Sequence, residues 1–248
     1  MGIFDFLKKN KNIENVNGLN EIYDDNGKGE VKSIFYKKNG EIDGLYESYT
    51  DGVLISHEEY KNGKKHGLTT WYYTEGEILT VWEYKNGKKH GLSTWYYTDG
   101  KIMRTKEYKN GKNVGLEKSY YENGVLEREV NHKDGKYDGL SKEYHESGNL
   151  YFEKNYEYGQ LYGPWKSYYE NGQIHEEGNW SRGEESGVYK FYSENNQLIS
   201  ELIFGVGNIE SVILEGPIGP VLKDQQEQIK KEKHNDMMKS MIFQKKII

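Results

Sequence analysis

The chain has 248 residues, of which 34% are hydrophobic and none is cysteine, so disulfides and thiolate metal sites are excluded. A chain this poor in apolar residues cannot build a thick aliphatic core, whereas its 23 tyrosines suit a thin sheet with aromatic faces. Acidic residues outnumber basic ones by 40 to 34, for a net charge of −6, and we therefore expect no nucleic-acid partner.

Residues 1–17 are predicted to form an N-terminal amphipathic segment. Ile3, Phe4, Phe6 and Leu7 are spaced as in a short amphipathic helix, which we expect to dock on the first hairpin, because it is too short to anchor in a membrane alone. The segment lacks the apolar stretch and cleavage site of a secretory signal, and no run approaches 18 apolar residues. We therefore expect a cytoplasmic protein.

Residues 18–215 contain an internal repeat marked by glycine. The interval is 24 residues, apart from a first step of 23, at Gly44, Gly67, Gly91, Gly115, Gly139, Gly163 and Gly187. A period of this length indicates tandem copies of one supersecondary unit. Residues 18–215 are therefore predicted to be a repeat array.

Each copy is predicted to be a β-hairpin. In the copy that begins at Gly67, turn residues near Gly76 and at Asn86–Gly87 separate two runs rich in aromatic and β-branched residues. We call the Gly76-type turn the inner turn and the Asn86–Gly87-type turn, which links successive copies, the outer turn. The fold class predicted is all-β, an antiparallel sheet of about seven to nine consecutive hairpins.

Apolar positions recur in step with glycine and predict the buried face. Leu68 and Tyr72 in the first strand of a copy, and Ile78 and Tyr84 in the second, are separated by even numbers of residues, which places them on one face of a sheet. That face is predicted to be the core of the array.

Four aromatic residues are predicted to lie on the opposite face and to contact a partner, since Trp and Tyr are typical interface anchors. They are Trp71, Tyr73, Trp95 and Tyr97. The alternative is that the chain's own N-terminal segment covers them.

Lysines cluster at the outer turns, and Lys64, Lys65, Lys88 and Lys89 are candidate contact residues. A lysine rim could follow phosphates or anionic lipid. Alternatively, it could keep the protein soluble and protect a sheet edge.

Charge also changes along the chain. Residues 53–114 have a net charge of +4, with 11 basic and 7 acidic side chains, and residues 115–215 have −10, with 9 basic and 19 acidic ones. Within the acidic part, Glu176, Glu177, Glu184 and Glu185 are candidate contacts for a basic partner. The alternative is that these charges only maintain solubility.

No catalytic or cofactor-binding motif is present. Gly-x-Ser-x-Gly, phosphate-cradling and His-Glu-x-x-His sequences are all missing. His66 and His90 occupy the same repeat position, but about 9–10 Å between equivalent residues is too far to share one metal ion. We predict a non-enzymatic protein without metal or cofactor.

Residues 216–248 are rich in Gln, Lys and Glu and include Met237, Met238 and Met241, a composition typical of a charged helical tail. The tail either folds back over the last hairpin or projects from it.

Two recurring elements resemble the MORN repeat. Tyr84–Leu92 reads Tyr-x-Asn-Gly-Lys-x-x-Gly-Leu, and Tyr96–Gly100 reads Tyr-Tyr-x-x-Gly. The variant is similar to that of bacterial YwqK-type antitoxins and covers about residues 40–205. The resemblance implies an elongated, twisted sheet without catalytic residues, which would neutralise a toxin by direct binding. The alternative is a scaffold or peripheral membrane-associated protein that binds anionic lipid through the lysine rim.

Overall fold

The computed structural model describes residues 12–13, 17–23, 30–205 and 208–214, and every regular element among them is a β-strand. The N-terminal helix expected within residues 1–17 and the tail expected at 216–248 lie in parts of the chain that are not described, apart from a few residues before β2. Across the described ranges, no helix is long and apolar enough to cross a membrane. The chain divides into two compact units, residues 1–160 and 161–248.

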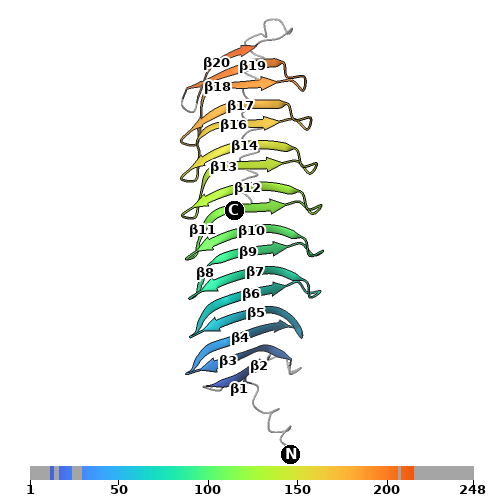
Figure 1. The fold of residues 1–248 in the computed structure, drawn as a ribbon, viewed down its shortest axis with the longest axis vertical. Helices are drawn as coiled ribbons and strands as arrows, with labels where there is room; N and C mark the ends of the chain where they lie inside the picture. The colour runs from blue at the N-terminus through green and yellow to red at the C-terminus, as the bar shows by residue number, and fades with distance from the viewer. Residues whose placement is uncertain (1–11, 14–16, 24–29, 206–207, 215–248) are drawn as a thin grey trace, which may run out of the picture. The chain divides into compact units, whose positions relative to one another are not determined.

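The first unit is a series of antiparallel strands in which each strand pairs with the next along the chain (Figure 1). Its strands are β1 (Asn12–Ile13), β2 (Gly18–Tyr23), β3 (Val31–Lys38), β4 (Glu41–Thr50), β5 (Val53–Lys61), β6 (Lys64–Tyr72), β7 (Ile78–Lys85), β8 (Lys88–Lys89), β9 (Gly91–Tyr96), β10 (Ile102–Lys109), β11 (Lys112–Tyr120), β12 (Leu126–Lys133), β13 (Lys136–Tyr144) and β14 (Leu150–Glu157). The short β8 and the longer β9 both pair with β7, so together they form the first strand of one copy.

The second unit continues the hairpin pattern within itself, because β17 pairs with β16 and β18, and β19 pairs with β18 and β20. Its strands are β16 (Gly163–Tyr168), β17 (Ile174–Ser181), β18 (Glu184–Tyr192), β19 (Leu198–Gly205) and β20 (Asn208–Leu214), and β15 (Gln160–Leu161) contains the boundary. The prediction of an antiparallel sheet of consecutive hairpins is confirmed in each unit.

The outer turns are two-residue turns in which both residues have positive φ. In the turn between β7 and β8, φ is 52° at Asn86 and 80° at Gly87, the backbone of a type I′ turn. The Gly87 N–H donates to the Lys65 carbonyl of the preceding outer turn at 2.8 Å, and the same bond recurs at Gly63, Gly111, Gly135, Gly159 and Gly183. Each outer turn is therefore held in place by the one before it.

The inner turns are joined by tyrosine hydroxyls. The Tyr97 hydroxyl donates to the Tyr120 carbonyl of the next repeat at 2.6 Å. Equivalent bonds run from Tyr73 to Tyr96, from Tyr121 to Tyr144 and from Tyr169 to Tyr192. Successive hairpins are thus bonded side by side at both ends of their strands.

The prediction that the leucine position belongs to the core is wrong. Leu68 is 49% exposed and Leu92 56% exposed, whereas the residues that follow them, Thr69 and Ser93, are fully buried. Thr69 pairs across the ladder with Trp82, and Leu68 pairs with Glu83 on the other face. The buried face of the first unit therefore combines small polar residues with large aromatic ones.

Register shifts explain the error. Trp71 pairs with Thr80 and Tyr72 with Ile78, so one step along β6 corresponds to two steps along β7. Such irregularities interrupt the alternation of faces that even spacing assumes. Ile78 and Tyr84, although separated by an even number of residues, consequently lie on different faces, with exposed Ile78 on the face of Leu68 and Tyr84 on the other.

In the second unit the equivalent repeat positions are occupied by larger apolar residues. Trp165, Tyr189 and Phe204 are buried, with ring centroids 5.5 Å apart for Trp165 and Tyr189 and 4.7 Å apart for Tyr189 and Phe204. Gly178 leaves space for these rings, because a Cβ there would lie 2.7 Å from the Tyr189 ring and 2.8 Å from Trp165 Nε1.

Tyr158 occupies the first position of an outer turn with φ of 51°, where four other outer turns have Asn. Asn tolerates this backbone better than Tyr, so Tyr158→Asn is expected to raise the free energy of unfolding by about 1 kcal/mol. Asn110→Tyr, the reverse change in an equivalent turn, is expected to lower it by a similar amount. Urea denaturation measures both, and a loss of stability in Tyr158→Asn would contradict the explanation.

Tyr97→Phe removes the hydroxyl that joins two inner turns and leaves the Tyr120 carbonyl without that donor. We expect a loss of about 1 kcal/mol in the free energy of unfolding. Tyr36→Phe, at an exposed tyrosine of β3, is the matched control and is expected to have little effect. Equal losses in both variants would show that the bond does not stabilise the array.

Candidate functional site

The strongest candidate surface is the more buried of the two sheet faces formed by β5 to β10. We call it the tryptophan face. It is defined by Trp71, Trp82 and Trp95 and the residues paired with them. Ser56 pairs with Trp71, Thr69 with Trp82, and Thr80 with Trp95, and each small partner is buried while each Trp is half-buried. Trp71 and Trp95 were predicted to lie opposite the core, which is wrong, because they belong to the more buried face.

Trp82 is at the centre of this cluster. Its ring centroid lies 6.1 Å from that of Trp95 and 6.3 Å from that of Tyr84, with tilted planes. The indole N–H of Trp82 is buried and has no acceptor among the described residues. The face therefore presents a group of tilted aromatic rings over a layer of small buried residues.

Lys89 lies directly on the Trp82 ring, with its ammonium 3.4 Å from the ring centroid and 5.2 Å from that of Tyr108. Such cation–π contacts hold a lysine against an aromatic surface. Burial lowers the pKa of Lys89, and the nearby charges of Lys106 and Lys65 lower it further.

The two neighbouring lysines differ from Lys89 because each has a carboxylate partner. Lys65 Nζ lies 2.8 Å from Glu58, and Lys106 Nζ lies 3.2 Å from Glu117. No ion pair of Lys89 exists among the described residues. The predicted pair Lys65 and Lys89 is thus brought together with Trp71 and Trp95, and Lys89 is the cation without a carboxylate.

Tyr73 and Tyr97 have a structural role in the described part of the chain. They lie at the inner turns, after the ends of β6 and β9, and their hydroxyls bond the next repeat. The four predicted aromatic residues therefore divide into two on the tryptophan face and two at a rim.

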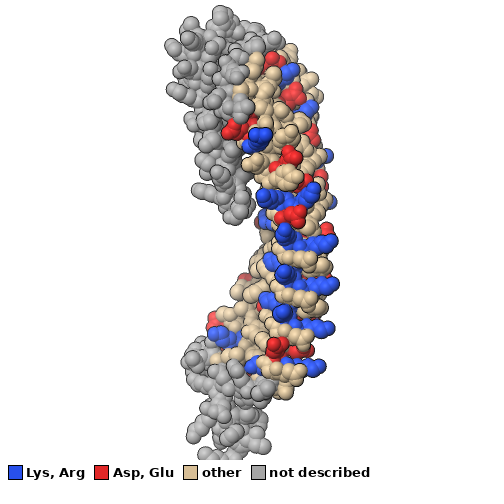
Figure 2. Space-filling model, turned by 90° about the vertical axis from the view of Figure 1, so that its left-hand side faces the viewer, with Lys and Arg blue, Asp and Glu red and all other residues tan. Residues whose placement is uncertain are grey.

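The lysines beside the outer turns form a second feature, which we call the lysine column (Figure 2). Its members are exposed residues that face one another in register, as Lys61 with Lys64, Lys85 with Lys88, Lys109 with Lys112, and Lys133 with Lys136. The predicted Lys64 and Lys88 belong to it. The predicted lysine rim is present, but Lys65 and Lys89 turn to the tryptophan face instead.

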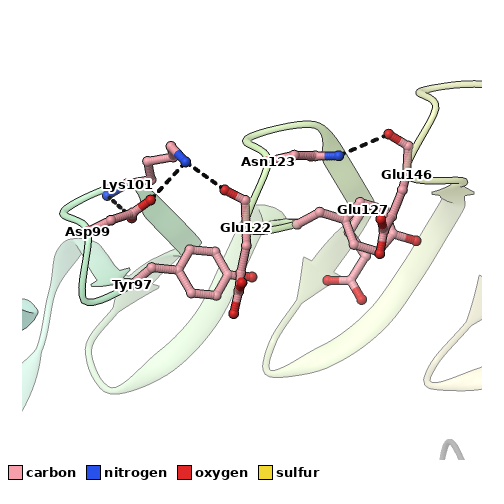
Figure 3. Close-up of a pocket in the computed structure, with 8 residues that line it drawn as sticks. Tyr97, Asp99, Lys101, Glu122, Asn123, Glu127 and Glu146 are labelled. Atoms are coloured by element: carbon pink, nitrogen blue, oxygen red, sulfur yellow. Dashed lines mark hydrogen bonds and ion pairs between the residues drawn. The ribbon is translucent and has the colours of Figure 1, made fainter.

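The opposite rim of the first unit carries an acidic hollow of about 650 Å³ between two inner turns (Figure 3). Asp99, Glu122, Glu127 and Glu146 line it, with Lys101. Lys101 Nζ lies 2.8 Å from Asp99 and donates to the Glu122 carbonyl at 2.9 Å. The described residues contain no group of three or more histidine, cysteine or acidic side chains able to hold a metal ion.

The four predicted glutamates of the second unit do not form one surface. Glu176 and Glu177 are adjacent in β17 and point to opposite faces, where Glu176 pairs with Phe191 and Glu177 with Lys190. Glu177 accepts the Tyr192 hydroxyl at 2.8 Å and lies 3.4 Å from Lys166.

Glu184 and Glu185 also differ from each other. Glu184 is exposed beside an outer turn, whereas Glu185 is 8% exposed and faces Trp180 across the ladder. One Glu185 carboxylate oxygen has no hydrogen-bond partner in the described part of the chain, and burial raises the pKa of this group to about 7.

Sequence reasoning missed Trp82, Tyr108 and Lys106. Trp82 lies two residues before Tyr84, and Lys106 lies two residues before Tyr108, the equivalent tyrosine of the next copy. Because side chains alternate between faces along a strand, each of them shares a face with its tyrosine. That spacing was the available signal. It was obscured because the tyrosine had been assigned to the same face as the exposed leucine.

Comparison with known proteins identifies the repeat. The family model described as MORN repeat variant matches six segments, residues 65–86, 89–110, 113–134, 137–158, 161–181 and 185–204, more than half of the chain. The chain belongs to the MORN repeat variant family. MORN repeats are generally protein- or lipid-binding modules.

Other comparisons add little. No curated protein matches the chain. A solved structure entitled "Crystal Structure of TarM" aligns with 12% identity over 52% of this chain and 21% of that one, with a TM-score of 0.21, too low to support a conclusion. Each MORN match begins just after an outer turn, so the family unit contains one inner turn and the two strands beside it.

Glu185→Gln tests the buried carboxylate. Because the folded-state pKa of about 7 exceeds the ordinary value of 4.5, protonation stabilises the fold fully below pH 4.5, and this contribution is lost as pH rises through 7. The variant is therefore expected to be more stable than wild type by about 2–3 kcal/mol at pH 8 and equally stable at pH 4. Glu184→Gln, the exposed neighbour, should show no such pH dependence in thermal denaturation. A pH-independent effect of Glu185→Gln would overturn the assignment.

Proposed function

We propose that this chain is a non-enzymatic binding protein whose tryptophan face contacts another protein. The observation that carries the proposal is the group formed by Trp82, Trp95 and Lys89. Half-buried tryptophans flanked by charged residues are typical energetic centres of protein interfaces, because they exclude water at little cost in side-chain entropy.

The polar groups of this face indicate what the partner contributes. The Trp82 N–H lacks an acceptor, and Lys89 lacks a carboxylate, among the described residues. An acidic side chain on the partner would pair with Lys89, whereas the Trp82 N–H is buried within the chain and is not accessible to a partner. Complementary charges at such a contact also speed association and reject wrong partners.

We further propose that the partner is a toxin and that the chain acts in the cytoplasm as a YwqK-type antitoxin or immunity protein. Direct binding would block the toxin sterically, without any catalytic residue in this chain. The resemblance of the repeats to the YwqK variant supports this assignment. The exposed acidic residues of the second unit, such as Glu184, provide a further contact for a basic partner.

The test is reconstitution with the product of the neighbouring gene. Wild type is expected to form a stable 1:1 complex and to suppress the activity of that protein, and Trp82→Ala is expected to weaken binding by about 2 kcal/mol or more. Circular dichroism checks that the variant is folded. Leu68→Ala, an exposed apolar residue on the other face, is the matched control. Binding that Trp82→Ala leaves unchanged would refute the tryptophan face as the contact.

The second candidate is peripheral attachment to anionic lipid, which the exposed lysine column favours. Flotation with vesicles that contain phosphatidylglycerol, compared with phosphatidylcholine alone, measures it. Salt-sensitive binding to the anionic vesicles, without a protein complex, would favour this candidate over the first.

A further inference from the structure

The lysine column places like charges opposite one another. Four successive outer turns each carry a directly paired Lys–Lys couple, such as Lys85 with Lys88 and Lys109 with Lys112. Like charges at directly opposed positions destabilise a sheet. A set of four such couples therefore calls for an anionic neighbour that offsets the repulsion.

The described residues of the chain do not supply that neighbour. Lys112 has an exposed contact with Asp134 at 3.7 Å, and the other seven lysines of the column form no ion pair with the described residues. The lysines are also held at fixed spacing, since the glycine N–H of each outer turn bonds the preceding turn, as from Gly111 to Lys89 at 2.8 Å. The column is thus a preorganised row of cations along one rim (Figure 2).

The other rim of the same unit has the opposite charge. Its inner turns carry exposed acidic residues, and one exposed cation, Lys101, lies among them and is paired with Asp99. The acidic residues are Asp51, Glu75, Glu77, Asp99, Glu122, Glu127 and Glu146. Glu122, Glu127 and Glu146 line the open hollow and form no ion pair in the described part of the chain (Figure 3).

The two rims share one period. Both are ends of the same hairpins, and each hairpin adds two strands of about 4.8 Å, so lysine couples and acidic turns both repeat at about 9–10 Å. Charges on one rim therefore match charges on the other rim at every repeat, provided that two copies lie side by side in the same direction.

We propose that the lysine column binds the acidic inner-turn rim of a second copy of this chain. Lysines of one copy then enter the hollows between inner turns of the next, such as that lined by Glu122 and Glu146. Because the contact joins two different rims, each copy keeps a free rim, and the association is head-to-tail. This interaction leaves the tryptophan face uncovered, so it is independent of the proposed partner.

The experiment uses two charge-reversed variants of the full chain. Lys88→Glu with Lys112→Glu introduces two carboxylates into the column and also converts two like-charged couples into opposite ones, so the fold is retained. Glu122→Lys with Glu146→Lys introduces two lysines at exposed positions of the inner rim, one repeat apart as in the column variant. Lys118→Gln with Lys142→Gln removes two lysine charges outside the column, without placing like charges opposite one another, and is the control.

Sedimentation velocity is measured at low salt and at about 0.5 M salt, where the Debye length falls to a few ångströms. Wild type and the control are expected to associate at low salt and to dissociate at high salt. Each reversed variant alone should lose association by about tenfold or more, and mixing the two should restore it, because the introduced carboxylates of one variant then face the introduced lysines of the other. A variant that had merely lost its fold would not be restored by mixing.

Three results would overturn the proposal. They are a wild type that is monomeric at all salt concentrations, an association that survives both reversals, and reversed variants that do not associate when mixed. Binding of a monomeric wild type to phosphatidylglycerol vesicles, lost in Lys88→Glu with Lys112→Glu, would assign the column to lipid instead.

Discussion

The two-residue outer turn is the constraint on which the array depends. Both of its residues must adopt positive φ, as at Asn86 and Gly87, because only this backbone matches the twist of the strands on either side. The turn also sends its glycine N–H to the carbonyl of the preceding turn, so that one local conformation sets the spacing between hairpins. The tyrosine hydroxyls do the same at the other rim, where Tyr97 bonds Tyr120. Every surface of the sheet inherits its periodicity from these bonds.

Aromatic rings and cations stabilise the first unit where a globular protein would use aliphatic side chains. Fully buried Thr69 and Ser93 leave room for half-buried Trp82 and Trp95, and Lys89 covers the exposed side of a ring. The second unit uses larger apolar residues on the equivalent face, with Gly178 making space for Tyr189. The same repeat therefore gives a face suited to binding in the first unit, and a face packed as a core in the second.

In the first unit, positive and negative side chains lie at opposite ends of the strands. The net charge of a stretch of sequence does not show this separation. Residues 53–114 have a net charge of only +4, yet lysines occupy their outer turns and carboxylates their inner turns. A hairpin places alternate turns at opposite rims, so nearby residues of opposite charge in the sequence become separated by a strand length. The exposed lysines and the acidic hollow are consequences of this separation.

The sequence by itself determined the repeat, the hairpins, the turn residues and the presence of a lysine rim, because each depends on local backbone preferences. It also brought Trp71, Trp95, Lys65 and Lys89 into consideration, although it placed the two tryptophans on the wrong face. The tertiary structure decided which face is buried, since the register shift after Trp71, where one residue of β6 lies against two of β7, breaks the alternation on which sequence counting relies. It also revealed Trp82 as the centre of the cluster and Glu185 as a buried carboxylate. These properties arise from pairing between strands, which determines what surrounds a side chain and cannot be read from one strand alone.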